Sequence, residues 1–307
     1  MTGQVDTLRQ IRDVVARHAG EGRAATALPR VELSRFSTAT PPTGETVSPS
    51  VALILQGDVR TVLCKRTLHY GAGQFVVASV DLPVTCAIQA TSRQPYLAFE
   101  MRLEPSVISD LLLAAPAPRT VTERTHVPSI ATGTADPDLL DVVGRMARLL
   151  DRPEDAAALA PLYEREILWR LISSDQGATV RQIGLPDSDV SQLGHAIGWI
   201  RTHYDQPLRV EELAARSSMS VTSFHRHFRA LTQMTPLQYQ KHLRLHEARA
   251  RLLAHPRDVA DAGHAVGYES PSQFSREYRR MFGAPPGRHA TQLRQPETPA
   301  TTPTPAQ

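Results

Sequence analysis

Two short segments in the last third of this 307-residue sequence carry hydrogen-bonding side chains at the spacing of a single helical face. In the first, Thr222, His225, Arg226 and Arg229 follow each other at i, i+3, i+4 and i+7. In the second, the stripe consists of Ser272, Gln273, Arg276 and Arg280, with Arg280 slightly off its centre. Arginine can donate two parallel hydrogen bonds to guanine, and glutamine can pair in the same way with adenine. Such stripes have the chemistry needed to recognise base edges in a DNA groove.

The two stripes belong to an internal repeat with an offset of fifty residues. Its apolar members are Phe224, Phe228 and Leu231 in the first copy and Phe274, Tyr278 and Met281 in the second. Each copy predicts a helix-turn-helix, with a short helix over 210–216 or 259–266 and a second helix that starts at Ser220 or Ser270. Serine is a good N-cap, and helix N-termini suit phosphate oxygens. We therefore expect Ser220 and Ser270 to contact the DNA backbone.

Residues 237–255 between the two copies predict one helix of about 19 residues, which at ~1.5 Å per residue is roughly 28 Å long. Major-groove faces on one side of a duplex repeat every ~34 Å. A connector of this length is suited to placing two recognition helices in successive grooves.

A single amphipathic helix of this kind is as often a solvated face as a DNA reader, but the charge of the segment favours DNA. Residues 192–294 contain 15 Lys/Arg and 8 Asp/Glu, a net charge of +7, whereas the rest of the chain has a net charge of −4. A doubled motif in a basic segment indicates a polyanion-binding module. Composition alone does not separate nucleic acid from an anionic membrane surface.

The remainder of the chain predicts an α+β protein. Short β-rich segments divided by Gly, Pro and Asp run from 50 to 103 and are typical of a small barrel or sandwich. Helices are expected at 5–19, 138–150 and 157–173, within a domain over 1–175. The polar residues 176–191 are expected to be a linker to the domain at 192–294, and the Pro- and Thr-rich tail at 295–307 is expected to be disordered.

Residues 193–290 resemble the DNA-binding domain of the AraC/XylS regulators, over segments 208–249 and 265–286 and the spacing between them. The resemblance implies base contacts by Thr222, His225 and Arg226 in the first unit and by Ser272, Gln273 and Arg276 in the second. Arg229, Arg279 and Arg280 match positions that lie near phosphates. Where the family usually has Ile-Ala, this chain has Ala262-Gly263, which should loosen the second unit.

Residues 49–103 are similar to the N-terminal domain of one AraC-type subclass. This resemblance implies a cupin-like β-barrel followed by helices used for dimerisation, and a small-molecule effector bound in the barrel. The partners implied for the whole chain are double-stranded DNA, the effector, RNA polymerase for an activator, and a second copy in a homodimer. Neither the effector, the operator, nor the direction of regulation follows from the residues.

The N-terminal segment offers few residues for catalysis. Only His69 and His126 lie in 24–130, without a His-x-His pair, so a metal site and a cofactor are not expected. Cys64 and Cys86 lie on predicted strands and are interpreted as small buried hydrophobes, with a sensor thiol as the alternative. No signal peptide or stretch of 18 apolar residues is expected, which predicts a cytoplasmic protein without a membrane segment. The resemblance to the AraC/XylS regulators implies that the protein is bacterial.

Three functions compete at this point. The first is a DNA-binding regulator controlled by an effector, and this is the one that we prefer. The second is a cupin-type enzyme fused to a DNA-targeting domain, which the missing ligand cluster disfavours, so the chain is not expected to be an enzyme. The third is a constitutive DNA-binding protein whose barrel only dimerises.

Overall fold

The computed structural model describes residues 2–114, 127–186, 188–254 and 258–294. The predicted disordered tail at 295–307 lies outside the described residues. The chain forms two compact units, one made of the residues up to Trp199 together with Arg209–Tyr239, and the other of Ile200–Leu208 together with the residues from Gln240 onward. Each unit contains one of the two repeat copies.

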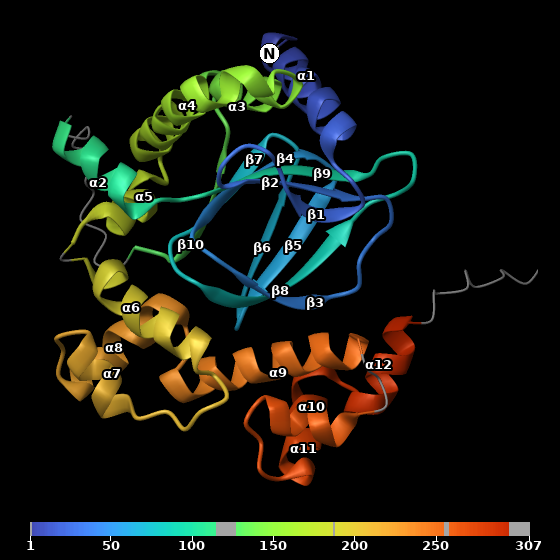
Figure 1. The fold of residues 1–307 in the computed structure, drawn as a ribbon, viewed down its shortest axis with the longest axis vertical. Coiled ribbons are helices and arrows are strands. Elements are labelled where there is room, and N and C mark those ends of the chain that lie inside the picture. Colours follow the sequence, from blue (N-terminus) through green and yellow to red (C-terminus); the bar gives the residue numbers. More distant parts are fainter. Residues whose placement is uncertain (1, 115–126, 187, 255–257, 295–307) are drawn as a thin grey trace, which may run out of the picture. The chain divides into compact units, whose positions relative to one another are not determined.

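The N-terminal part of the first unit contains two antiparallel sheets (Figure 1). The larger has the strand order β1-β2-β9-β4-β7-β10, and the smaller has the order β3-β8-β5-β6. The strands are β1 Gly22–Ala25, β2 Val31–Phe36, β3 Thr43–Val47, β4 Ser50–Gln56, β5 Asp58–Leu63, β6 Arg66–Gly71, β7 Gln74–Ala78, β8 Leu82–Gln89, β9 Tyr96–Arg102 and β10 Ile130–Thr134. Side chains from both sheets line one cavity between them, so the sequence was right to predict a cupin-like β-domain.

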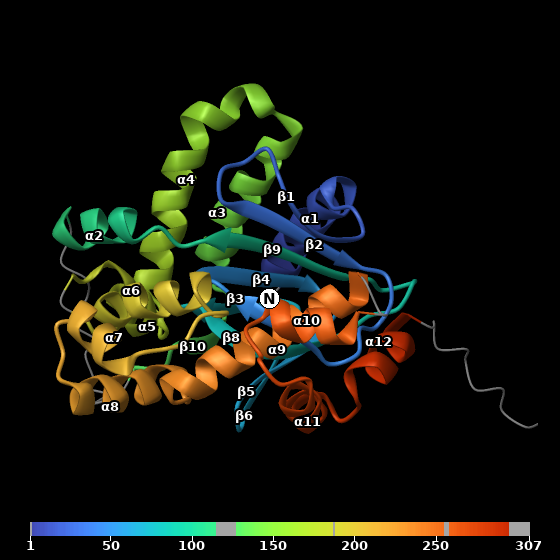
Figure 2. The ribbon, with the colours of Figure 1, turned by 60° about the horizontal axis from the view of Figure 1, so that its bottom comes forward.

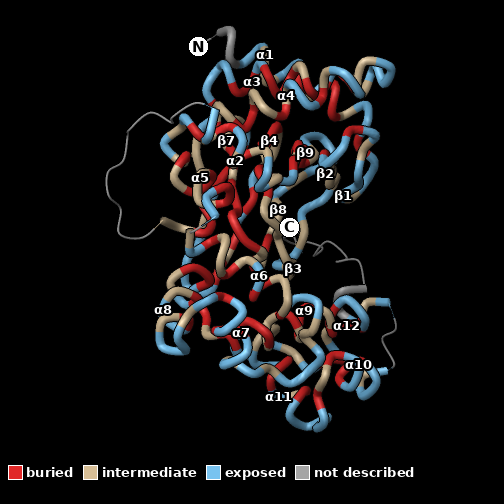
Figure 3. The backbone as a smooth tube through the Cα atoms, turned by 60° about the vertical axis from the view of Figure 1, so that its left-hand side comes forward, coloured by how far each residue is buried: buried red, intermediate tan, exposed pale blue. Residues whose placement is uncertain are grey.

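Strand β4 shows why the apolar run at 51–55 does not alternate. It lies between β9 and β7 in the centre of the larger sheet, and helix α1 (Thr2–His18) packs against it. With one face under α1 and the other toward the cavity, nearly every position is covered, as the long buried stretch of β4 in Figure 3 shows. A near-continuous apolar strand is the expected sequence for a strand covered on both faces.

Helices α1, α3 (Pro137–Arg148) and α4 (Pro153–Ser173) occupy the segments where the sequence predicted helices at 5–19, 138–150 and 157–173. α3 packs on both α1 and α4, and Figure 2 shows α3 and α4 side by side. Asp136 caps α3 by accepting a hydrogen bond from the Leu139 amide at 2.7 Å. A short 3-10 turn, Leu149–Asp151, connects α3 to α4.

The segment at 176–191, which was expected to be an interdomain linker, is partly helical. It contains helix α5 (Gly177–Gly184), which packs on α2 (Pro105–Ala114) and on α4. The buried face of α5 is formed by Thr179, Val180 and Ile183. Three residues are too few to show a helical period in the sequence, so the helix was not predicted. Its place as the boundary between two domains stays a prediction.

The remaining helices form the two repeat copies and the segments that connect them. They are α6 Asp189–Thr202, α7 Val210–Arg216, α8 Val221–Thr232, α9 Pro236–Ala254, α10 Val259–Ala265, α11 Pro271–Phe282 and α12 Pro286–Arg294. The predicted connector helix at 237–255 therefore corresponds to α9, which has 19 residues.

Candidate DNA-binding surface and interior cavity

The first helix-turn-helix is α7 followed by α8. The backbone turns at Ser218, which has a φ of 54°, and the Ser220 hydroxyl then accepts a hydrogen bond from the Ser223 amide at 3.3 Å. This is the N-cap that the sequence predicted. Phe224 and Phe228 are fully buried with their ring centroids 5.4 Å apart, and Phe228 meets Tyr239 edge-on at 5.6 Å. The aromatic stripe therefore fixes which face of α8 is turned outward.

The outward face of α8 holds every contact residue expected in this unit. Ser220, Thr222, His225, Arg226 and Arg229 are all exposed. The burial pattern thus places them together on one accessible helix face, which DNA contact requires. Whether each touches a base or a phosphate stays a prediction.

Arg226 is held by a short chain of polar contacts that the sequence did not suggest. The Arg226 guanidinium contacts His227 Nε2 at 2.9 Å, and His227 Nδ1 contacts Asp189 Oδ1 on α6 at 2.6 Å. If the guanidinium donates to Nε2, then Nδ1 must carry the ring proton and donate to Asp189. These contacts restrain Arg226 before any DNA is present.

The second helix-turn-helix is α10 followed by α11. The Ser270 hydroxyl caps α11 by accepting from the Gln273 amide at 3.3 Å, with Pro271 at the first turn. Phe274 and Tyr278 are fully buried. The predicted contact residues Ser270, Ser272, Gln273, Arg276, Arg279 and Arg280 are all exposed. As in the first unit, they share the accessible side of the second helix, and their individual roles stay predictions.

Ala262 and Gly263 were expected to loosen α10, but the structure gives them a packing role. Both are buried in α10, and a Cβ atom added at Gly263 would lie 3.0 Å from the Phe274 ring. The missing side chain therefore lets the aromatic ring of α11 approach the backbone of α10 closely. The relative strength with which the two units bind DNA stays a prediction.

Two polar clusters hold α9, α10 and α11 together. The Glu277 carboxylate, only 9% exposed as a residue, accepts from Lys241 Nζ at 2.9 Å and from the Tyr268 hydroxyl at 2.8 Å. Burial alone would raise the pKa of Glu277, but these donors outweigh it and lower the pKa below its ordinary value. Sequence reasoning missed this cluster because its members lie up to 36 positions apart.

The second cluster is an arginine that clamps the backbone. The Arg244 guanidinium donates to the carbonyls of Tyr204 at 2.5 Å, Gly267 at 2.8 Å and Gln206 at 3.0 Å. It therefore ties the turn between α10 and α11 to the chain that precedes the first helix-turn-helix. Three charge-assisted bonds in one fork make this a rigid joint.

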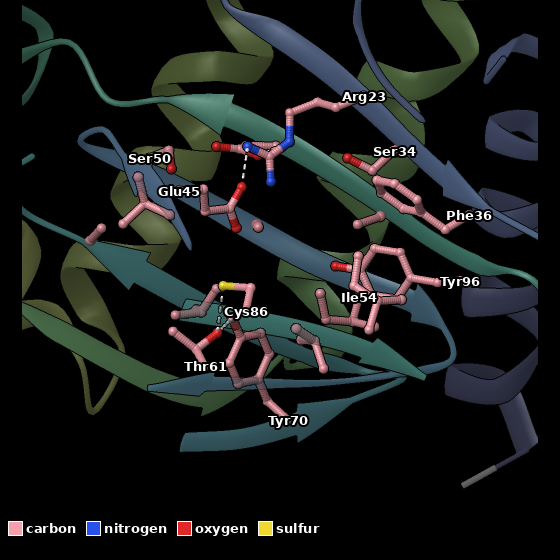
Figure 4. A pocket seen from close by; sticks show the side chains of 18 of the residues that line it. Arg23, Ser34, Phe36, Glu45, Ser50, Ile54, Thr61, Tyr70, Cys86 and Tyr96 are labelled. Atoms are coloured by element: carbon pink, nitrogen blue, oxygen red, sulfur yellow. Dashed lines mark hydrogen bonds and ion pairs between the residues drawn. The ribbon is translucent and has the colours of Figure 1, made fainter. Parts of the chain in front are cut away.

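Between its two sheets the β-domain has an open cavity, and the empty space there is about 630 Å³ when the open solvent at its mouth is counted with it. All ten strands contribute to its lining. Most of the lining is apolar or hydroxyl-bearing, but three charged side chains enter it. Two of them, Arg23 and Glu45, are labelled in Figure 4. Arg23 Nη1 lies 3.4 Å from Glu45 Oε2, and Arg23 Nε lies 3.6 Å from Glu100 Oε2. The cavity thus presents both apolar and charged surface.

A family model for the AraC-type transcriptional regulator N-terminus matches residues 27–179, and a helix-turn-helix domain model matches residues 213–292. The chain belongs to the AraC/XylS family. The first match ends inside α5, and the second runs from α7 into α12. Apart from residues 210–212 of α7, both helix-turn-helix copies lie within the match to the helix-turn-helix domain.

Two similar AraC/XylS relatives are HTH-type transcriptional activators named RhaS. The protein from Yersinia pseudotuberculosis is 29% identical over 143 residues, covering 47% of this chain and 50% of that protein. The one from Escherichia fergusonii is 30% identical over 149 residues, covering 46% and 52%. The chain spans about half the length of these curated relatives.

The fold is similar to that of ToxT from Vibrio cholerae. An apo ToxT structure has a TM-score of 0.55 at 7% identity and covers 89% of this chain and all of that chain. A ToxT structure with a bound unsaturated fatty acid has a TM-score of 0.53 at 8% identity and covers 86% of this chain and 95% of that one. At this identity the likeness concerns the fold.

The two cysteines of this AraC/XylS chain lie in different surroundings. Cys86, on β8, is buried, lines the cavity and lies 3.3 Å from the Thr61 hydroxyl. Cys64 is exposed and lies in the turn between β5 and β6 with a φ of 54°, so its assignment to a buried strand was wrong. Desolvation raises the pKa of both thiols, more strongly for the buried Cys86 than for Cys64, whose sulfur is only partly covered. A sensor role for either thiol stays a prediction, and the raised pKa disfavours the reactive thiolate.

Across the described ranges, no three His, Cys, Asp or Glu side chains gather closely enough to hold a metal ion. Within residues 2–114, 127–186, 188–254 and 258–294, no helix has both the length and the apolar character needed to cross a membrane.

Proposed function

We propose that this chain is a sequence-specific, cytoplasmic DNA-binding transcription regulator whose activity is controlled by a small molecule in the cavity of its β-domain. One observation carries the proposal. Each of two capped helices, α8 and α11, buries an aromatic stripe and exposes a polar stripe that ends in arginine. A helix that is held firmly on one face and offers donors on the other fits the major groove.

The roles proposed for the exposed side chains follow from their position on these helices. Side chains near the N-terminal half of each helix are proposed to read bases, and these are Thr222, His225, Arg226, Ser272, Gln273 and Arg276. The capping serines and the later arginines are proposed to bind phosphates, and these are Ser220, Arg229, Ser270, Arg279 and Arg280. The net charge of +7 over 192–294 supports strong attraction to the DNA backbone.

Control by an effector is supported by the cavity. Its lining combines aromatic and apolar surface with the group formed by Arg23, Glu45 and Glu100, which is partly open to solvent and suits a small molecule with polar groups. ToxT, which has the same fold, has been solved with a fatty acid bound. Family membership further supports contact with RNA polymerase and assembly into a homodimer, and argues against an enzyme.

The test is a footprint of the full chain on the DNA beside its own gene, repeated over a salt series. A protected sequence whose affinity falls steeply as salt rises is expected, because each neutralised phosphate releases counterions. Protection that is absent, or that does not depend on salt, would reject DNA regulation. An enzyme would instead show substrate turnover, and a constitutive regulator would give a footprint that no metabolite changes.

A further inference from the structure

We propose that the cavity binds a small organic cation, a protonated amine attached to an apolar or aromatic body. The inference rests on the proposed role of the cavity as an effector site and goes beyond it by naming the chemical class of the ligand. It starts from the balance of charge inside the cavity. Two carboxylates, Glu45 and Glu100, share a single guanidinium, that of Arg23. Figure 4 shows Arg23 beside Glu45.

The contacts among these three groups leave both carboxylates with hydrogen-bonding capacity. Strong charge-assisted N–H···O bonds measure ~2.7–2.9 Å. The distances from Arg23 to Glu45 and Glu100 are 3.4 Å and 3.6 Å, clearly longer. The guanidinium lies between the two acids and is committed to neither. An ammonium group placed beside them would supply short donors that Arg23 does not supply.

The other ionisable groups of the lining do not add a positive charge. Burial raises the pKa of the Cys86 thiol and of the Tyr70 and Tyr96 hydroxyls, so all three remain neutral at pH 7. The lining therefore contains one guanidinium and two carboxyl groups. Two carboxylates beside one guanidinium leave the lining with one excess negative charge, which a monovalent cation would complement. An anionic ligand would increase it.

Aromatic rings complete the recognition of a cation. Phe36 and Tyr96 lie with their ring centroids 6.2 Å apart and tilted by 51°, and both reach into the cavity in Figure 4. Tyr70 closes another part of the wall, where its hydroxyl lies 2.8 Å from the Thr61 hydroxyl. The faces of such rings attract ammonium groups. Ile54, Val59 and Ile88 offer apolar surface for the body of the ligand.

An anion bound by Arg23 is the main competing occupant. A carboxylate bound at Arg23 would have to share the guanidinium with Glu45 and Glu100 and would add a third negative charge beside them. A cation adds no negative charge and can join the existing three groups. Charge complementarity therefore favours the amine over the acid.

The test is calorimetric titration of the full chain with three probes of the same shape and different charge, namely benzylamine, benzyl alcohol and benzoate. We expect the order of affinity to be benzylamine, then benzyl alcohol, then benzoate. In Glu45→Gln and Glu100→Gln the affinity for benzylamine should fall by about tenfold or more, since a charge-assisted contact is lost. The affinity for benzyl alcohol should change by less than threefold.

Glu154→Gln is the matched control, because Glu154 is exposed in the first turn of α4 and lies outside the cavity. It should bind benzylamine as the parent does. Tightest binding of benzoate, lost in Arg23→Gln, would overturn the proposal in favour of an anion site. Equal affinity for all three probes, no binding of any probe, or an unaffected Glu45→Gln would also overturn it.

The same protein preparations are also footprinted on DNA. This distinguishes a failure of the cation proposal from a failure of the proposed function. Normal DNA protection without amine binding would reject the cation proposal and leave the proposed function standing. Unchanged affinity for benzyl alcohol would show that the cavity of the glutamine variants is folded. Amine binding without DNA protection would reject the proposed function and leave the chemistry of the cavity intact.

Discussion

Replacing Gly267 with alanine should disrupt the second helix-turn-helix far more than its small size suggests. Gly267 lies in the turn between α10 and α11 with a φ of +85°, a conformation that costs an L-residue ~1–2 kcal/mol. An added Cβ atom would also overlap the carbonyl oxygen of Asp205 and lie 2.9 Å from Arg244 Nη2. It would therefore push apart the joint in which Arg244 binds the Gly267 carbonyl.

The expected magnitude follows from these two terms. Loss of one charge-assisted hydrogen bond in a partly buried joint adds roughly 1.5–3 kcal/mol to the backbone strain. The lower entropy of an alanine in the unfolded chain offsets ~0.4–1 kcal/mol. The net loss of local stability should be about 2–4 kcal/mol.

Gly283→Ala is the matched control. Gly283 caps α11 with a similar φ of +79°, but nothing lies within 4 Å of an added Cβ atom there. It should lose only the backbone term of ~1 kcal/mol. The difference between the two variants isolates the overlap at Asp205.

Hydrogen–deuterium exchange on the full chain measures both variants in place. Peptides from 259–282 should exchange roughly thirtyfold faster or more in Gly267→Ala, because local opening becomes easier. The footprint should lose protection at the half-site bound by α11. Equal exchange in Gly267→Ala and Gly283→Ala would refute the reasoning, since it would mean that the joint at Asp205 and Arg244 adds nothing.

Three further predictions concern the polar groups of the two units. Arg226→Ala should weaken specific DNA binding by about 1–3 kcal/mol and relax the base preference at one operator position. Arg229→Ala should instead weaken binding to all DNA sequences and reduce the slope of log affinity against log salt concentration by about one. Competition assays on operator variants distinguish these two outcomes. Asp189→Ala should release His227 and thereby reduce discrimination at the position assigned to Arg226, with unchanged affinity for random DNA in the same assay. The lowered pKa of Glu277 means that its carboxylate stabilises the fold above its ordinary value of 4.5 and that this stability is lost as the pH falls through the folded pKa. Exchange protection of α11 should decline over that range in the parent and not in Glu277→Gln, and parallel declines would contradict the assignment.

The helical repeat was predictable because its signal is local. Phe224, Phe228, Phe274 and Tyr278 recur at the period of a helix, and the structure buries all four. The residues between them must then face outward, which is where the contact residues lie. Ser220 and Ser270 could be identified as caps for the same reason, since an N-cap acts within three residues of itself.

The features that the sequence did not reveal depend on distance along the chain. Arg244 reaches carbonyls up to 40 positions away, and no spacing rule relates it to Tyr204 or Gln206. Strands β1 to β3 were not predicted, since they are short and only β2 has a clear buried face. Cys64 follows an apolar strand directly, so its place in the turn could not be distinguished from a strand end.

The difference between local and long-range contacts affects how DNA recognition and ligand binding can each change by substitution. The surface proposed to read DNA depends on local patterns, so a substitution at Arg226 or Arg276 changes recognition without disturbing the aromatic stripe beneath it. The residues that line the cavity do not follow a local sequence pattern. Arg23, Glu45 and Glu100 come from β1, β3 and β9, and their meeting depends on the pairing of strands across both sheets. A single exchange there, such as Glu100→Gln, would rebalance the cavity toward a neutral ligand and leave the helices that bind DNA untouched. The charge of the effector is therefore set by residues that only the folded sheets bring together.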